Sequence, residues 1–172
     1  MRFKQKKGDA VDMLIIVISI FFLSIIFLTY WYFTTTTATA LASTPINTTE
    51  TQAGIASLNM LGTTGASNGF IMIFGALILG LLLSSFFIDQ HPIFIPIYIV
   101  LLIVTIIMAV FLGNAYAQIT DPSIANNPFA DAAAAQPVID AVMRNIVRIA
   151  LGAGLLSMLI VFGKIAKASG GP

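Results

Sequence analysis

Long stretches without any charged residue are the feature that most limits what this chain can fold into. No charge occurs between Asp12 and Glu50, between Glu50 and Asp89, or between Asp89 and Asp121. A helix needs roughly 20 predominantly apolar residues to cross a hydrocarbon layer of ~30 Å, and each of these stretches is longer than that. The chain is therefore predicted to be an integral membrane protein.

Composition supports the same class and excludes several others. Hydrophobic residues make up 58% of the 172 residues and charged residues only 9%, whereas a soluble domain carries about 25% charged residues. The net charge of +1 gives no basic surface for nucleic acid. Cysteine is absent, which excludes disulfides, thiol chemistry and zinc–thiolate sites. A soluble domain and a nucleic-acid partner are therefore not expected.

The apolar stretches predict an all-α fold in a single membrane domain, residues 1–172. Four transmembrane helices are expected, at residues 13–33, 69–88, 93–117 and 138–163. Only Asp89–Pro92 separates the second helix from the third, so these two should form a tight hairpin. Pro92 suits the first position of a helix, because its missing N–H would have no partner there.

Two outer loops complete this plan, at residues 34–68 and 119–137. The first is rich in Thr, Ser, Ala and Asn and is predicted to be a polar excursion with little regular structure, apart from a short helix within 55–61. In the second, Asn127 followed by Pro128 is a helix-start signal, and Phe129–Ala135 favours a helix. We expect this short helix to lie on the membrane surface before the last span.

The basic residues predict the orientation of the chain. Four precede the first span, at Arg2, Lys4, Lys6 and Lys7, and two more follow the last span, at Lys164 and Lys167. With four spans both termini share one side, and the excess of basic residues places that side in the cytoplasm. The first span is interpreted as a retained anchor; the Ala-Leu-Ala at Ala40–Ala42 leaves cleavage as the alternative.

Small residues at intervals of four predict helix packing. Lipid does not drive helices together as water does, so smooth faces that let backbones approach closely gain importance. Such faces occur in three of the four spans, with the residues Ala76, Gly80 and Ser84; Thr105, Ala109 and Gly113; and Ala150 and Gly154. Packing inside the chain and packing against other subunits are both compatible with this pattern.

Polar and aromatic residues mark the expected membrane borders. Tyr30, Trp31 and Tyr32 end the first span as an aromatic belt at head-group level. Asp140, Arg144 and Arg148 are spaced four apart and share one helix face near the outer border of the last span. There the arginines are expected to contact lipid phosphates, and Asp140 to pair with Arg144. An ion pathway, or a site for an acidic group of a partner, is the alternative.

No constellation of residues predicts a reaction. His91 lies beside Asp89 in the predicted hairpin, and one histidine with one carboxylate is insufficient for a metal site or a proton relay. A role in capping the hairpin is the simpler interpretation. No catalytic, cofactor-binding or metal-binding residue is predicted, and the chain is not expected to be an enzyme.

Three segments give the chain a resemblance to known proteins. They are the start Lys6-Lys7-Gly8-Asp9-Ala10-Val11-Asp12, the hairpin Asp89–Pro96 with a helix ending Gly113-Asn114-Ala115-Tyr116, and the closing Val161-Phe162-Gly163-Lys164. This layout resembles small multi-span membrane proteins of tailless, internal-membrane viruses of bacteria and archaea. The resemblance implies a protein seated in a viral membrane, and it carries over no catalytic or binding residue.

These observations favour a non-enzymatic structural membrane protein, a component of a virion membrane. Its expected partners are the lipid bilayer and other membrane or capsid proteins, within an oligomeric assembly. An accessory subunit of a cellular membrane complex and a holin-like pore are the alternatives. A pore would need a polar lumen, and none of the predicted spans has a continuous polar stripe.

Overall fold

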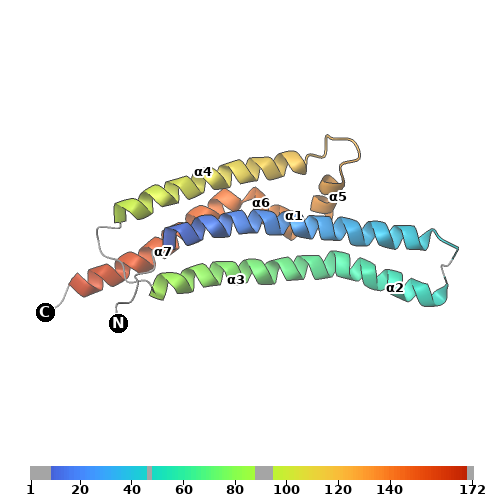
Figure 1. The fold of residues 1–172 in the computed structure, drawn as a ribbon, viewed down its shortest axis with the longest axis horizontal. Helices are drawn as coiled ribbons and strands as arrows, with labels where there is room; N and C mark the ends of the chain where they lie inside the picture. Colours follow the sequence, from blue (N-terminus) through green and yellow to red (C-terminus); the bar gives the residue numbers. More distant parts are fainter. Residues whose placement is uncertain (1–8, 46–47, 88–94, 170–172) are drawn as a thin grey trace. The chain divides into compact units, whose positions relative to one another are not determined.

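The computed structural model describes residues 9–45, 48–87 and 95–169, and no strand occurs among them. A π-helical segment, Leu61–Gly65, joins the second helix to the third. Figure 1 shows the helices in chain order: α1 (Asp9–Ala42), α2 (Thr49–Met60), α3 (Ala66–Phe87), α4 (Ile95–Ile119), α5 (Pro128–Ala135), α6 (Pro137–Arg144) and α7 (Ile146–Ser169). The predicted all-α fold is confirmed.

Four helical stretches are long and apolar enough to cross a membrane, as predicted. They are Val11–Ala42, Thr49–Ser85, Pro96–Ile119 and Ile146–Lys164. Only 17% to 28% of each stretch is buried inside the protein. Large apolar side chains on their outer faces are uncovered, including Met72, Phe111 and Leu159, which are 77%, 71% and 68% exposed. By composition these helices fit an integral membrane protein, whose outer faces contact lipid rather than water.

The prediction of an irregular excursion at residues 34–68 is wrong, because this segment is mostly helical. Helix α1 has 34 residues and is about 51 Å long, well beyond the ~30 Å of a hydrocarbon core. After residues 43–48, helix α2, the π segment and α3 form one further helical stretch. Residues 46–47 lie outside the part that the structure describes. The first two spans are therefore longer helices than the apolar runs alone indicated.

The threonines of this segment are compatible with the helix because their hydroxyls are satisfied within it. Thr35 Oγ1 donates to the carbonyl oxygen of Trp31 at 2.8 Å, and Thr39 Oγ1 to that of Thr35 at 2.9 Å. Such bonds to the preceding turn let a threonine remain inside a helix without an unsatisfied hydroxyl. Helix α2 then begins at a capping box, in which Thr48 and Thr51 exchange side-chain and backbone hydrogen bonds.

The predicted last span, 138–163, is divided by the structure into α6 and α7, with Asn145 between them. The short helix before it is confirmed as α5. Its N-cap is Asn127, whose Oδ1 accepts a hydrogen bond from the Phe129 N–H at 3.1 Å. The predicted hairpin between the second and third spans, with Asp89, His91 and Pro92, lies outside the described residues.

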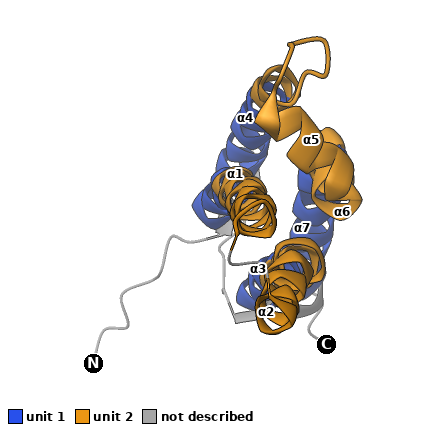
Figure 2. Ribbon diagram, turned by 90° about the vertical axis from the view of Figure 1, so that its right-hand side faces the viewer, with its two compact units in different colours: residues 1–20, 74–113, 145–172 blue, residues 21–73, 114–144 orange. Residues whose placement is uncertain are grey.

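Contacts divide the chain into two compact units, coloured separately in Figure 2. Unit 1 comprises residues 1–20, 74–113 and 145–172, and its buried residues include Met13, Leu81, Leu102, Ala109 and Ala150. Unit 2 comprises residues 21–73 and 114–144, and its buried residues include Leu28, Phe70, Ala132, Ile139 and Met143. Each unit therefore has an apolar interior of its own.

Candidate functional site

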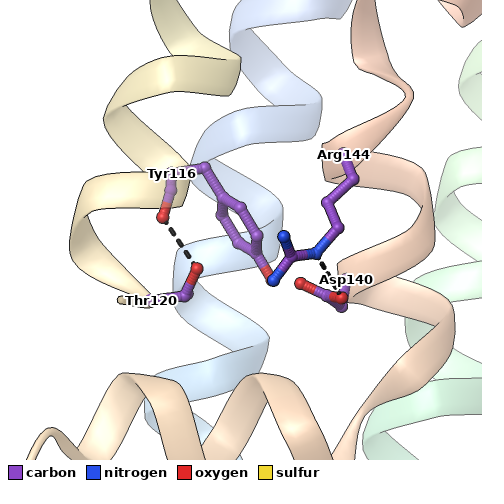
Figure 3. A network of polar contacts seen from close by, with 4 residues as sticks. All are labelled: Tyr116, Thr120, Asp140 and Arg144. Atoms are coloured by element: carbon purple, nitrogen blue, oxygen red, sulfur yellow. Dashed lines mark hydrogen bonds and ion pairs between the residues drawn. The ribbon is translucent and has the colours of Figure 1, made fainter. Parts of the chain in front are cut away.

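The most conspicuous polar cluster of unit 2 is formed by the end of α4 and by α6. Figure 3 shows Tyr116 of α4 and Thr120, which directly follows that helix, beside Asp140 and Arg144 of α6, with the Tyr116 ring directed toward the Asp140–Arg144 pair. The Thr120 hydroxyl donates to the Tyr116 carbonyl oxygen at 2.9 Å, so it is satisfied locally. The groups that define the cluster are therefore the phenol, the carboxylate and the guanidinium.

Asp140 and Arg144 form an ion pair, as their spacing predicted. Arg144 Nε donates to Asp140 Oδ2 at 2.7 Å, one turn apart on α6. The hydrogen bond to Asp140 raises the pKa of the Arg144 guanidinium above its ordinary value, and the negative charge of that carboxylate adds to the effect. The Arg144 side chain is 57% exposed, so solvent screening keeps the contribution of the pair to stability small, ~0.5 kcal/mol.

Tyr116 brings a buried hydroxyl to this pair. The residue is 1% exposed, and both its hydroxyl and Oδ1 of Asp140 are buried. The phenol interacts electrostatically with both charged residues, and its hydrogen-bonding interaction is with the Asp140 carboxylate. The buried donor and the buried acceptor of the cluster are therefore directed to each other.

Arg148, the third member of the predicted polar face, has a different role. Its Nη1 donates to Asn145 Oδ1 at 3.1 Å, and its side chain is exposed. It lies in the first turn of α7, at the start of the last candidate span. The predicted contact of these arginines with lipid phosphates stays a prediction.

A buried glutamine, not predicted from the sequence, connects two distant segments of unit 2. Gln136, between α5 and α6, is fully buried, and its Nε2 donates to the carbonyl oxygens of Gly62 at 3.0 Å and Thr63 at 3.1 Å. Both carbonyls belong to the π segment, where the widened turn changes the ordinary i→i−4 pairing of backbone groups. The signal available in the sequence was the polar Gln136-Pro137 interruption between two helical runs.

In unit 1 most small residues of the third and fourth spans are buried inside the chain, which is one of the two arrangements that their spacing left open. Thr105, Ala109 and Ala150 are buried. Gly154 is buried too, and a Cβ there would lie 2.7 Å from the Met13 Cε and also clash with Leu102. The Tyr98 hydroxyl donates to the Gly154 carbonyl oxygen at 3.0 Å, using the close approach that a glycine permits. Gly113, the last member of the third-span set, is half-buried.

The small residues predicted in the second span do not pack inside the chain in the same way. Ala76 and Gly80 are exposed, and a Cβ on Gly80 would meet nothing within 4 Å. Ser84 is half-buried and donates to the Leu81 carbonyl oxygen of its own helix at 2.9 Å. Its neighbour Ser85 is the buried one, and it shares a hydrogen bond with Ser157 of α7. Packing of the Ala76–Gly80 face against other subunits stays a prediction.

The predicted aromatic belt lies on α1 within unit 2. Tyr30 and Tyr32 are 40% and 44% exposed, and Trp31 between them is half-buried. The Trp31 Nε1 is buried and has no hydrogen-bond partner among the described residues. Exposed tyrosines beside a half-buried tryptophan are typical of the membrane–water interface.

Within the part of the chain that the structure describes, no three His, Asp or Glu side chains gather as a metal site would require. No family model, curated protein or solved structure matches this chain. Its function is therefore argued from its own residues.

Proposed function

We propose that this protein is a non-enzymatic structural component of a membrane, packing with copies of itself or with other membrane or capsid proteins. The observation that carries the proposal is an apolar groove on unit 1, lined by α3 and α7. It has a volume of about 360 Å³, and every residue that lines it is apolar, including Phe74, Gly75, Leu82, Gly152 and Leu156. A groove of this kind accepts an apolar helix face rather than a polar substrate.

Glycines keep this groove open. A Cβ on Gly75 or on Gly152 would meet nothing within 4 Å, so neither glycine is required for packing inside the chain. Ala76 and Gly80 are exposed elsewhere on α3 and do not line the groove. Because lipid solvates apolar side chains well, two membrane helices associate best where small residues let their backbones approach. The groove with its two glycines is therefore the preferred place for a neighbouring membrane helix.

The setting of this assembly is proposed from the resemblance in layout. A virion membrane fits a small chain of four apolar helices without cysteine, with both termini on the same, cytoplasmic-type side. In this proposal the polar cluster of Tyr116, Asp140 and Arg144 has a structural role near the outer border of the membrane, and the exposed Arg144 contacts lipid phosphate.

Site-specific crosslinking tests the proposal, and the absence of cysteine makes single-cysteine variants unambiguous. Gly152→Cys and Ile107→Cys are prepared in the native membrane and labelled with a maleimide–benzophenone crosslinker. Gly152 lines the groove and is exposed, whereas Ile107 is 62% exposed on α4 and does not line the groove, so it is the matched control. Illumination should join Gly152→Cys to a second copy or to another membrane protein in a discrete band, while Ile107→Cys gives chiefly lipid adducts.

Lipid adducts alone at both positions would contradict the proposal. A liposome leakage assay separates it from the pore alternative. A structural component leaves an entrapped dye inside, whereas a holin-like protein releases it as the protein-to-lipid ratio rises.

A further inference from the structure

A second groove, on unit 2, differs from the apolar groove because polar groups line it. It has a volume of about 450 Å³ and lies along the outer part of α1, and Asp131 of α5 also lines it. Its lining residues include two aromatic residues, four serine or threonine residues and one acid: Trp31, Tyr32, Thr35, Thr36, Thr39, Ser43 and Asp131. We propose that this groove binds the primary ammonium head group of a phospholipid.

Three hydroxyls along the groove keep acceptor capacity. The hydroxyls of Thr35, Thr39 and Ser43 donate to carbonyl oxygens of the preceding turn of α1, at distances of 2.8–2.9 Å. Once a hydroxyl has donated its proton, its remaining lone pairs only accept. A primary ammonium supplies three donors for such acceptors, while the Tyr32 phenol and the Thr36 hydroxyl of the lining match the phosphate of the same head group.

The negative charge of the Asp131 carboxylate favours a positively charged donor. Asp131 is exposed and lies in the first turn of α5. The ion pair found among the described residues joins Arg144 to Asp140 and leaves the Asp131 carboxylate available. The faces of Trp31 and Tyr32 add a favourable environment for a cation, because the centre of an aromatic ring carries partial negative charge.

The position of the groove along α1 indicates that the ammonium group belongs to a lipid. Trp31 and Tyr32 end the uncharged stretch that begins after Asp12, so they lie at head-group depth when α1 spans the membrane. Ser43 is twelve residues beyond Trp31, about 18 Å further along the helix. The groove thus starts where phospholipid head groups lie and extends outward from them. This inference is independent of the proposed assembly, because the groove is on a different unit from the apolar groove.

Native mass spectrometry of the detergent-solubilised chain tests the inference with short-chain lipids. Dihexanoyl phosphatidylethanolamine carries the primary ammonium, dihexanoyl phosphatidylglycerol lacks it, and dihexanoyl phosphatidylcholine keeps the charge without N–H donors. The chain should retain phosphatidylethanolamine about fivefold better than either of the others. Free ethanolamine at the same concentration should bind far more weakly, because it has no acyl chains to contact the apolar helix faces.

Two variants locate the binding. Asp131→Asn should reduce phosphatidylethanolamine binding about fivefold, to the level of phosphatidylglycerol. Glu50→Gln is the matched control, because Glu50 is an exposed acid in the first turn of α2 that does not line the groove, and it should bind as the unaltered chain does. Thr39→Val, which removes one acceptor with little change in shape, should reduce binding about twofold.

Equal retention of the three lipids would overturn the inference, as would unchanged binding by Asp131→Asn. Free ethanolamine binding as tightly as phosphatidylethanolamine would identify a site for a soluble amine and would overturn the assignment to lipid. Loss of phosphatidylethanolamine in Glu50→Gln as well would show a general effect of negative charge and would also count against the groove.

Discussion

The side-chain amide of Gln136 donates to the carbonyl oxygen of Gly62 at 3.0 Å, joining residues that are far apart in the sequence. A second bond from the same nitrogen reaches Thr63. The π segment Leu61–Gly65 is thereby fixed to the junction between α5 and α6 within unit 2. This contact accounts for a fully buried glutamine in a chain whose interior is otherwise largely apolar.

Replacing this glutamine should destabilise unit 2. Gln136→Leu removes both N–H donors and leaves the buried carbonyl oxygen of Gly62, and the part-buried one of Thr63, without them, at an expected cost of about 1–3 kcal/mol. Unfolding in mixed micelles of dodecyl maltoside and SDS, followed by circular dichroism, measures the change. Gln52→Leu, at an exposed position of α2, is the control and should shift stability by less than about 0.5 kcal/mol. Equal effects of the two substitutions would contradict this role of Gln136.

Two glycines of the second helical stretch should respond oppositely to alanine. A Cβ on Gly62 would clash with the Thr34 Oγ1 and lie 3.2 Å from the Thr34 Cβ, so Gly62→Ala should cost about 1–3 kcal/mol. A Cβ on Gly54 would meet nothing within 4 Å, so Gly54→Ala should stabilise α2 by up to about 1 kcal/mol through helix propensity. The same micelle titration compares them. Unchanged stability of Gly62→Ala would show that Thr34 does not pack closely on Gly62, and destabilisation by Gly54→Ala would contradict the open space around Gly54.

A serine pair inside unit 1 should couple α3 to α7. Ser85 and Ser157 are both buried, and their hydroxyls share a hydrogen bond. A double-mutant cycle with alanine at each position should give a coupling of about 0.6 kcal/mol, and no more than about 1.7, the range measured for such bonds in membranes. A cycle with Ser84→Ala in place of Ser85→Ala should give none, because Ser84 donates within its own helix.

The turn after α4 should respond to acid. The Ser123 N–H donates to Asp121 Oδ1 at 2.9 Å, and this hydrogen bond lowers the pKa of the Asp121 carboxyl below its ordinary value of about 3.9. A lowered pKa means that the stabilisation is complete above that ordinary value and is lost as the pH falls through the lower, folded-state value.

The amide proton shift of Ser123, recorded by NMR during an acid titration, reports this loss. It should move with a midpoint below about 3.9. In Asp121→Asn the same titration should leave the shift unchanged, and a midpoint at or above the ordinary value in the unaltered chain would contradict the contact.

The sequence predicted the positions of the long apolar helices well. Uncharged stretches identified the first three candidate spans because burial in lipid tolerates so few charges. The last span contains Arg148 and begins at Ile146, eight residues later than the predicted start at residue 138. Asn127 and Pro128 marked the start of α5 because capping depends on local residue types. The Thr-rich segment was misjudged because the helix satisfies its hydroxyls internally, an option that residue preference alone does not reveal.

Packing partners were less predictable than the helices themselves. A spacing of four identified Ala109 and Gly154 in the interior as well as Gly80 on the surface, since periodicity defines a helix face but not what covers it. The buried hydroxyls of Tyr98, Ser85 and Ser157 were overlooked, although isolated polar residues within apolar spans are a recognisable signal of interhelical bonding. The π segment and its contact with Gln136 depend on tertiary structure and left little trace in the sequence.

Quantitative mass spectrometry of the native membrane or particle that contains this chain tests the structural role most directly. Peptides of this chain are counted against those of the other membrane and capsid proteins as purification proceeds. A structural component should remain at a fixed molar ratio to at least one of them through successive steps. A ratio that falls continuously while the other proteins keep theirs would contradict the account.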